Sequence, residues 1–270
     1  MKKIAEYTDA ELITRIMDVE AVKTLVYKRG IYIANDWREK ELEELWVADE
    51  AHKASAAMGK NIGWYVGMDN IKAYYVDKHQ ADLEASLKEL SLAMPEIENV
   101  PENLGTGWLT NRPATTGLVE VAEDGKTAKG LFYAIAQETT PKTDGTAAGM
   151  WVPEKQAYDF VKEDGEWKIW HVVQAVDSVC PAGENYENND PVVDYTKDPI
   201  MIEFGEPTVK CLTHDATFNW WDDYPPRPVP YTTWSDDISY GPEGYRPHEF
   251  FAWKGGEGKF APTPEVEKEG

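Results

Sequence analysis

The chain has 270 residues, 42% of them hydrophobic, which is enough for the core of one large domain or of one domain with an extension. It carries 49 acidic and 27 basic residues, giving a net charge of −22. We therefore expect neither nucleic acid nor an anionic membrane surface as a partner, because both attract clustered lysine and arginine. No stretch approaches the roughly 20 apolar residues of a membrane span.

The N-terminal sequence MKKIAEYTDAEL has no apolar run behind its two lysines, so it does not read as a secretory signal. The two cysteines, Cys180 and Cys211, form no metal-binding motif. We expect a cytoplasmic protein in which both thiols are reduced.

Helical patterns occupy the first third of the chain. Thr8 and Glu11 form a capping box that predicts a helix from residue 9. Asp18 is expected to open a second helix, whose apolar face runs over residues 19–34 and which ends at Asn35-Asp36. Further helices are predicted around three apolar groups: Leu42, Leu45 and Trp46; Ile71, Tyr74 and Tyr75; and Leu83, Leu87 and Leu90. A loop between Pro95 and Pro101 leads to a sheet that begins near Trp108.

Three Asp-Gly pairs, at 124–125, 144–145 and 164–165, are spaced twenty residues apart. Asp-Gly is typical of tight β-hairpins, because the central positions of a type I′ turn require positive φ. The intervening segments are rich in β-branched and aromatic residues. We therefore predict four antiparallel strands over residues 115–122, 126–139, 146–161 and 166–178.

Strand 166–178 alternates between two largely apolar faces. Trp167, Ile169 and His171 share one face, which we expect to be the inner one, and Trp170 and Val172 share the other. Both faces are expected to be covered. The helices would cover one, and a partner subunit or the C-terminal segment would cover the other.

After residue 179 the sequence changes character. Residues 180–200 are polar and rich in turn residues, and a strand is expected within 200–212. Residues 218–253 combine many aromatic residues with six prolines, too apolar for a disordered tail and too proline-rich for a regular helix. We predict an extended arm laid over its own domain or over a neighbouring subunit. The domains are thus 1–178 and an extension over 179–270.

Three stretches carry a family resemblance. They are DVEAVKTLVYKRGIYIANDWREKELEELWVA at 18–48, EDGKTAKG at 123–130 and YDFVKEDGEWKIWHV at 158–172. Over about residues 9–178 the chain resembles the SnoaL-like group of the nuclear-transport-factor fold. The resemblance implies an α+β cone, in which a curved antiparallel sheet wraps around N-terminal helices and leaves a pocket in its mouth. Members include polyketide cyclases, dehydratases and steroid isomerases, alongside plain binding domains, and the enzymes use no metal or organic cofactor.

The resemblance also points to site residues. In related dehydratases the first long helix supplies a Tyr and an Asp, which would be Tyr32 and Asp36 here, and the sheet supplies a His. His171 is our candidate for that histidine, because an imidazole can move a proton near pH 7. Two of the three have a structural alternative: Asp36 would end a helix, and His171 would be a core histidine bonded to a backbone carbonyl.

The sequence departs from the dehydratase pattern at one point. Those enzymes carry their histidine on the first strand, shortly before a proline, where this chain has Asn111-Arg112-Pro113. We expect Arg112 or Asn111 to stabilise negative charge on the substrate, or Arg112 to be a surface residue. An aromatic lining for a flat ligand is expected from Trp64, Tyr65, Trp108 and Tyr133, which are equally typical of an ordinary core.

No metal site is expected, since the spacing of His214 with Asp215, Asp222 and Asp223 is a weak signal. The leading hypothesis is a cofactor-free lyase or isomerase acting on a hydrophobic cyclic or aromatic small molecule. Asp36 or His171 would move the proton, and Tyr32 would bind a substrate oxygen. The alternatives are a non-catalytic small-molecule-binding domain and a structural partner. We expect a homodimer or higher homo-oligomer, with the arm acting as a lid or at the interface.

Overall fold

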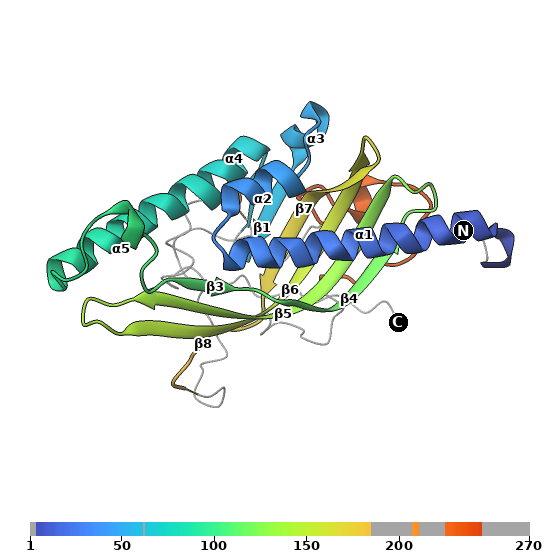
Figure 1. Ribbon diagram of the computed structural model, residues 1–270. Helices are drawn as coiled ribbons and strands as arrows, with labels where there is room; N and C mark the ends of the chain where they lie inside the picture. Colours follow the sequence, from blue (N-terminus) through green and yellow to red (C-terminus); the bar gives the residue numbers. More distant parts are fainter. Residues whose placement is uncertain (1–3, 62, 185–206, 211–224, 245–270) are drawn as a thin grey trace, which may run out of the picture.

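The computed structural model describes residues 4–61, 63–184, 207–210 and 225–244 (Figure 1). Five α-helices and nine strands are defined in this part of the chain, and the strands form one mixed sheet. The long helix α1 crosses one face of the sheet, and segment 225–244 lies on the opposite side (Figure 1). The α+β cone fold predicted from the sequence is confirmed.

Helix α1 (Asp9–Ala34) begins with the predicted capping box, in which Thr8 Oγ1 accepts a hydrogen bond from the backbone of Glu11. The second helix predicted to open at Asp18 is not separate, because α1 is continuous through this residue. The Asp18 carboxylate instead accepts hydrogen bonds from Lys162 Nζ at 2.6 Å and Trp167 Nε1 at 2.9 Å. These partners on the sheet explain an acidic residue that is not a helix cap.

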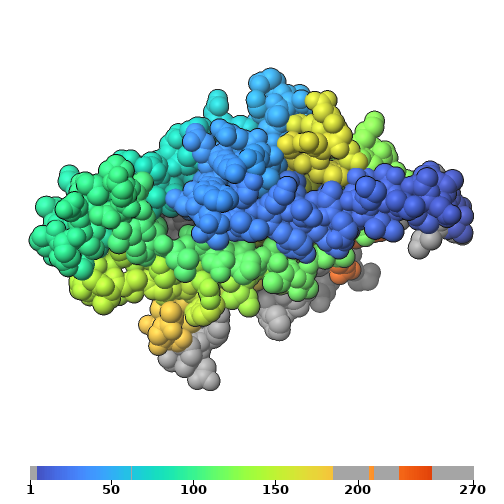
Figure 2. Space-filling model, in the orientation of Figure 1, coloured from blue at the N-terminus to red at the C-terminus, as the bar shows by residue number. Residues whose placement is uncertain are grey.

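The remaining α-helices are all shorter than α1. They are α2 (Arg38–Leu45), α3 (Glu50–Ser55), α4 (Met68–Lys72) and α5 (His79–Ala93). A π-helical segment, η2 (Ala73–Lys78), joins α4 to α5 without a break, so residues 68–93 form one long helical rod. Single turns of 3₁₀-helix occur at η1 (Ile4–Glu6), η3 (Pro101–Asn103) and η5 (Asp236–Ile238). Figure 2 shows the helices of the first hundred residues, in blue to green, forming much of this side of the molecule.

The sheet has the strand order β3-β5-β6-β7-β1-β2-β9, with β4 paired to β5 and β8 paired to β6. The strands are β1 (Ala57–Lys60), β2 (Gly63–Val66), β3 (Leu109–Asn111), β4 (Ala114–Val121), β5 (Thr127–Pro141), β6 (Ala147–Glu163), β7 (Glu166–Val176), β8 (Cys180–Pro181) and β9 (Val209–Lys210). Strands β1 and β7 pair in parallel, and the other named pairs are antiparallel. The four predicted strands are thus β4 to β7. Gly125, Gly145 and Gly165 all have positive φ, but of the three aspartates only Asp164 does, so only the third turn has the two positive φ values predicted for a type I′ turn.

A β-bulge at Trp170 changes the two faces of β7. Asp159 pairs with His171 and Phe160 pairs with Ile169, so Trp170 is an extra residue in β7. Ile169 and Val172 both join the core under the helices, whereas Val173 joins a separate cluster on the outer face. The prediction that His171 shares the inner face with Ile169 is therefore wrong, because simple alternation stops at the bulge.

Segment 225–244 packs on part of the outer face of the sheet in the same chain. Tyr240 packs there with Trp64, Leu131 and Val173. Its backbone N–H donates to Asp159 at 2.5 Å, and Glu123 donates its backbone N–H to Tyr231 at 3.0 Å. The described part of the predicted arm thus lies on its own domain, on the face of the sheet opposite the helices. The rest of the arm, most of the strand expected at 200–212 and Cys211 lie outside the described residues, and the boundary predicted at 178 stays a prediction.

Within the described residues, no helix is long and apolar enough to cross a membrane.

Tyr240 provides a test of this docking. We expect Tyr240→Ala to lower the free energy of unfolding by about 3 kcal/mol, because the side chain is only 1% exposed and its removal leaves a cavity against the sheet. Tyr133→Ala is the matched control, since Tyr133 lies on the same outer face but is 45% exposed, and it should cost less than about 1 kcal/mol. Urea denaturation measures both values. Equal losses would show that the segment does not dock at Tyr240.

Candidate functional site

A cavity of about 80 Å³ lies between the helical rod, α1 and the sheet. Its buried end contains Arg29, Lys60 and Gln174, all 9% exposed or less. Its more open end contains Arg38, Lys78, His79, Asp82 and Trp108. The cavity is therefore lined by charged groups as well as aromatic rings, and lysines and arginines outnumber the carboxylates of Asp82 and Glu138 in its wall.

Arg29 connects the cavity to the core. Its Nε donates to Glu41 at 2.9 Å, and its Nη1 donates to the Tyr158 hydroxyl at 3.1 Å. Glu41 is 0% exposed and also accepts hydrogen bonds from Tyr75 at 2.6 Å and Trp46 at 3.2 Å. Three elements around the cavity are thus tied to one buried carboxylate.

Arg112, a predicted site residue, lies in the cavity wall just after β3 and is buried. It donates hydrogen bonds to both Glu138 and Glu154. Burial opposes its charge, but these two carboxylates more than offset that and raise the pKa of Arg112. Gly30 allows α1 to approach closely, since a Cβ there would lie 3.3 Å from the Arg112 carbonyl oxygen. Arg112 is thus a buried cation of the site and not a surface residue.

Lys60 ends strand β1 at the buried end of the cavity and donates a hydrogen bond to Gln174 Oε1. Burial is the main reason that the pKa of Lys60 falls to about 7, and the nearby charge of Arg112 lowers it further. An amine with this pKa is partly neutral at physiological pH and can either accept a proton or hold an anion.

Asp36 ends α1 in a Schellman motif. Its backbone has φ 55°, its N–H donates to Ile33 at 3.1 Å, and the N–H of Trp37 donates to Tyr32 at 2.9 Å. The Tyr32 and Trp37 rings make the accompanying edge-on contact, with centroids 5.6 Å apart. A left-handed conformation is unfavourable for most residues other than glycine, although aspartate tolerates it better than most.

Asp36 does not itself line the cavity, but its carboxylate bonds to two residues that do, His79 and Arg38. His79 Nε2 lies 2.8 Å from Asp36 Oδ1, and Arg38 Nε donates to the same oxygen at 2.9 Å. Partial burial opposes the charge of Asp36, but the hydrogen bond and charge of His79, with that of Arg38, lower its pKa. His79 and Arg38 both line the cavity. The arrangement is a carboxylate–imidazole dyad at the entrance of a buried, polar pocket.

His171 and Tyr32 are not part of this dyad. His171 lies on the outer face of the sheet, where its Nδ1 is 2.9 Å from Asp159 and its Nε2 is 3.2 Å from the Ser55 carbonyl oxygen. Tyr32 donates to Glu44 at 2.5 Å on the surface between α1 and α2. Neither residue lines the cavity. The expected pairing of Asp36 with His171 is therefore absent among the described contacts, and His79 takes that place.

The predicted substrate-binding residues are dispersed. Trp108 lines the cavity, close to His79. Tyr65 stacks on Tyr74 in the core, at 3.8 Å between centroids, and Trp64 points to the outer face, since neighbours on a strand alternate. Tyr133 is exposed on the outer face, and Asn111 bonds to Gln137 at 3.4 Å beside the cavity. Of this group, only Trp108 contributes to the cavity wall.

The structure adds His79, Arg29 and Lys60 to the site. Arg29 carried a signal in the sequence, because it falls on the apolar face of α1 at helical spacing from Val22, Val26 and Ile33. A charged residue on a buried face indicates a buried partner or a function. His79 and Lys60 have no comparable local signal.

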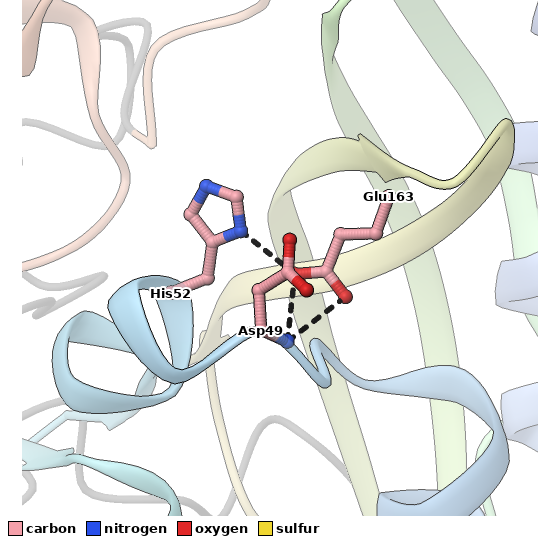
Figure 3. Close-up of side chains that lie close together, drawn as sticks. All are labelled: Asp49, His52 and Glu163. Carbon is pink, nitrogen blue, oxygen red and sulfur yellow. Dashed lines mark hydrogen bonds and ion pairs between the residues drawn. The ribbon is translucent and has the colours of Figure 1, made fainter.

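One group of described residues has the spacing of a metal site. Asp49, His52 and Glu163 each offer a ligand atom, all within 4.8 Å of one another (Figure 3). Glu163, however, accepts the backbone N–H of Ala48 at 2.7 Å and lies 2.7 Å from His52 Nδ1. These contacts attach the start of α3 to the end of β6, which accounts for the group without an ion. The weaker candidate at His214 lies outside the described part of the chain.

The fold and the cavity define an α+β cone with a polar, cation-rich pocket. Residues 14–173 match the family model of the SnoaL-like domain, and the chain belongs to this family. No curated protein matches the chain.

Three solved structures illustrate the likeness. A candidate scytalone dehydratase from Novosphingobium aromaticivorans has 12% identity and a TM-score of 0.44, covering 64% of this chain and 93% of its own. The hexachlorocyclohexane dehydrochlorinase LinA-type3 from Novosphingobium barchaimii has 14% identity and a TM-score of 0.42, covering 64% and 97%. An NTF2-like protein with a cystatin-like fold from Novosphingobium aromaticivorans has 15% identity and a TM-score of 0.43, covering 65% and 91%. At this level of identity the likeness does not extend to activity.

The lowered pKa of Lys60 makes a prediction about stability. In the unfolded chain the amine keeps its proton up to about pH 10.4, so between pH 7 and that value the folded protein binds fewer protons and its stability rises with pH. Lys60→Met removes the cost of burying the charge. We expect it to raise the free energy of unfolding by about 2 kcal/mol or more at pH 6, and by progressively less as pH approaches 10.

Denaturation of both proteins across this pH range measures the difference. Lys53→Met is the control, since Lys53 is exposed on α3, and its effect should stay within about 0.5 kcal/mol throughout. A stabilisation by Lys60→Met that does not change with pH would contradict a lowered pKa.

Proposed function

We propose that the chain is a lyase or isomerase that moves a proton on a small cyclic or aromatic molecule bound in the cavity. The observation that carries the proposal is the His79–Asp36 dyad at the mouth of that cavity. A histidine oriented by a carboxylate is the usual arrangement of a general base. Membership of the SnoaL-like family, which the sequence resemblance associates with dehydratases and isomerases, supports the same class of reaction.

In the proposed mechanism Asp36 accepts the Nε2 hydrogen of His79. This hydrogen bond selects the tautomer whose Nδ1 is free of a proton and can take one from the substrate. Because the Asp36 pKa is lowered, the carboxylate stays ionised and stabilises the imidazolium that forms. Arg112 then stabilises negative charge on a substrate oxygen, the role that the sequence suggested for it. His79 thus replaces His171 as the proposed proton carrier, and no metal or organic cofactor is part of the scheme.

A non-catalytic binding domain is the rival hypothesis. Such a domain would have a largely apolar pocket with isolated polar contacts. The cavity here has Arg29, Lys60 and Arg112 in its wall, all buried. A wall with three buried cations differs from that expectation, and the dyad supports the enzyme.

The dyad can be tested with a panel of hydroxylated cyclic ketones and acids, following elimination or double-bond migration by ultraviolet absorbance. We expect His79→Asn and Asp36→Asn to lower the rate by about 10²–10⁴-fold, the usual contribution of a general base. His52→Asn is the matched control, because His52 bonds to Glu163 outside the cavity, and it should keep the wild-type rate.

Asp36→Gly separates catalysis from folding. Glycine is the preferred residue at a left-handed helix end, so this variant should be as stable as the wild type or more stable, yet it should be inactive. Full activity in Asp36→Gly, or equal losses in the His79 and His52 variants, would refute the dyad. Inactivity of the wild type on every compound, with the cavity holding an unchanged ligand, would favour the binding domain.

We also propose a cytoplasmic homo-oligomer. Leu118, Tyr133, Ile135 and Trp151 are exposed apolar residues on the outer sheet face, each between 38% and 58% exposed. Contact between two such faces would bury them. Light scattering should give at least twice the mass of one chain for the wild type and the mass of one chain for the double variant Tyr133→Lys, Ile135→Lys. A monomeric wild type would contradict this expectation.

A further inference from the structure

The buried end of the cavity contains a hydrogen-bond donor with no acceptor in the protein. Arg29 is 1% exposed and lines the cavity, and its Nε and Nη1 donate to Glu41 and Tyr158. Among the described residues none accepts a hydrogen bond from its Nη2. A buried guanidinium nitrogen without an acceptor is costly, so this atom points to a group that enters the cavity.

The charges around Nη2 favour an anion over a neutral acceptor. Lys60 lies at the same end of the cavity, and Arg112 forms another part of its wall. The charges of Arg112 and Arg29 act to lower the pKa of Lys60, whereas those of Glu154 and Glu138 act to raise it. Glu41 is already saturated by three donors, and Glu154 accepts from Arg112 and Gln156. These carboxylates are thus held by other donors, and an incoming carboxylate would supply the acceptor that Arg29 Nη2 lacks together with a counter-charge for Lys60.

We propose that Arg29 Nη2 and Lys60 Nζ bind a carboxylate of the substrate at the buried end of the cavity. This inference rests on the proposed function and names its substrate class: a small cyclic or aromatic carboxylic acid. A planar carboxylate fits a guanidinium edge and an ammonium group together better than a lone hydroxyl does. Because His79 lines the more open end, the acid group would enter first and leave the reacting carbon nearer the dyad.

The arrangement also assigns separate tasks to the charged residues. The carboxylate would be held at the same place in the substrate and in the product, so Arg29 and Lys60 provide binding and orientation. His79 and Asp36 act on the proton. Loss of the carboxylate site should therefore weaken binding of any matching acid, whether or not that acid reacts.

Binding of benzoate and of benzamide, its neutral isostere, tests the proposal by calorimetry without any turnover. The wild type should bind benzoate at least tenfold more tightly than benzamide. Lys60→Met and Arg29→Lys should each weaken benzoate binding at least tenfold and leave benzamide unchanged. Arg29→Lys keeps a cation opposite Glu41 and removes Nη2, so it provides a second measurement if Lys60→Met does not fold.

Lys78→Met is the matched control, because Lys78 also lines the cavity but lies at its open end beside Asp82, at 2.5 Å. It should bind benzoate within about twofold of the wild type. Equal binding of the two probes by the wild type, or unchanged benzoate binding in both buried-end variants, would overturn the carboxylate site. That result would leave the His79 experiment untouched, since the dyad is tested by rate.

Discussion

The hydrogen-bonded ion pair between Arg29 and Glu41 is the interaction on which the rest of the structure depends. It joins α1 to α2, and through Tyr158 and Tyr75 it reaches both β6 and the π-helical segment. Removing one partner of so deeply buried a pair leaves an uncompensated charge and typically costs about 3–5 kcal/mol. The same pair fixes the guanidinium of a residue that lines the cavity and leaves its Nη2 without an acceptor among the described residues. Core and site are therefore built on one residue.

A second constraint is the bulge at Trp170, and it shows where prediction from sequence stops. The hairpins were predictable because Asp-Gly turns are encoded by two adjacent residues. The bulge adds one residue to β7 without any such local mark, yet it reverses the face of every residue that follows. His171 consequently lies against Asp159 and segment 225–244 instead of in the cavity. A strand can therefore be predicted with the correct bounds and still place a candidate site residue on the wrong side of the sheet.

The residues of the site differ in the same way. Asp36 could be proposed from the sequence because it ends a long helix in a pattern shared with the SnoaL-like family. Arg112 could be proposed because it stands just before Pro113, at the start of the sheet. His79 was not, since its partner lies 43 positions earlier in the chain and only the packing of two helices brings them together. Arg29 is an intermediate case. The sequence places a charged residue on the apolar face of a helix, and this alone indicates a buried partner or a function, but it does not identify the partner. Local chemistry is encoded locally, whereas pairing across elements depends on packing.

The π-helical segment explains how His79 comes to face Asp36. It occupies Ala73–Lys78, immediately before His79, and contributes Tyr74, Tyr75 and Lys78 to the cavity wall. A π-helical turn accommodates an additional residue, and one residue corresponds to about 100° of rotation in an α-helix. If these positions were regular α-helix, His79 would be rotated about the helix axis relative to Tyr74 and Tyr75. The imidazole and the two rings could then not all line the cavity. The less favourable helix geometry is thus located where it sets the rotation between the aromatic wall of the cavity and the imidazole of the dyad.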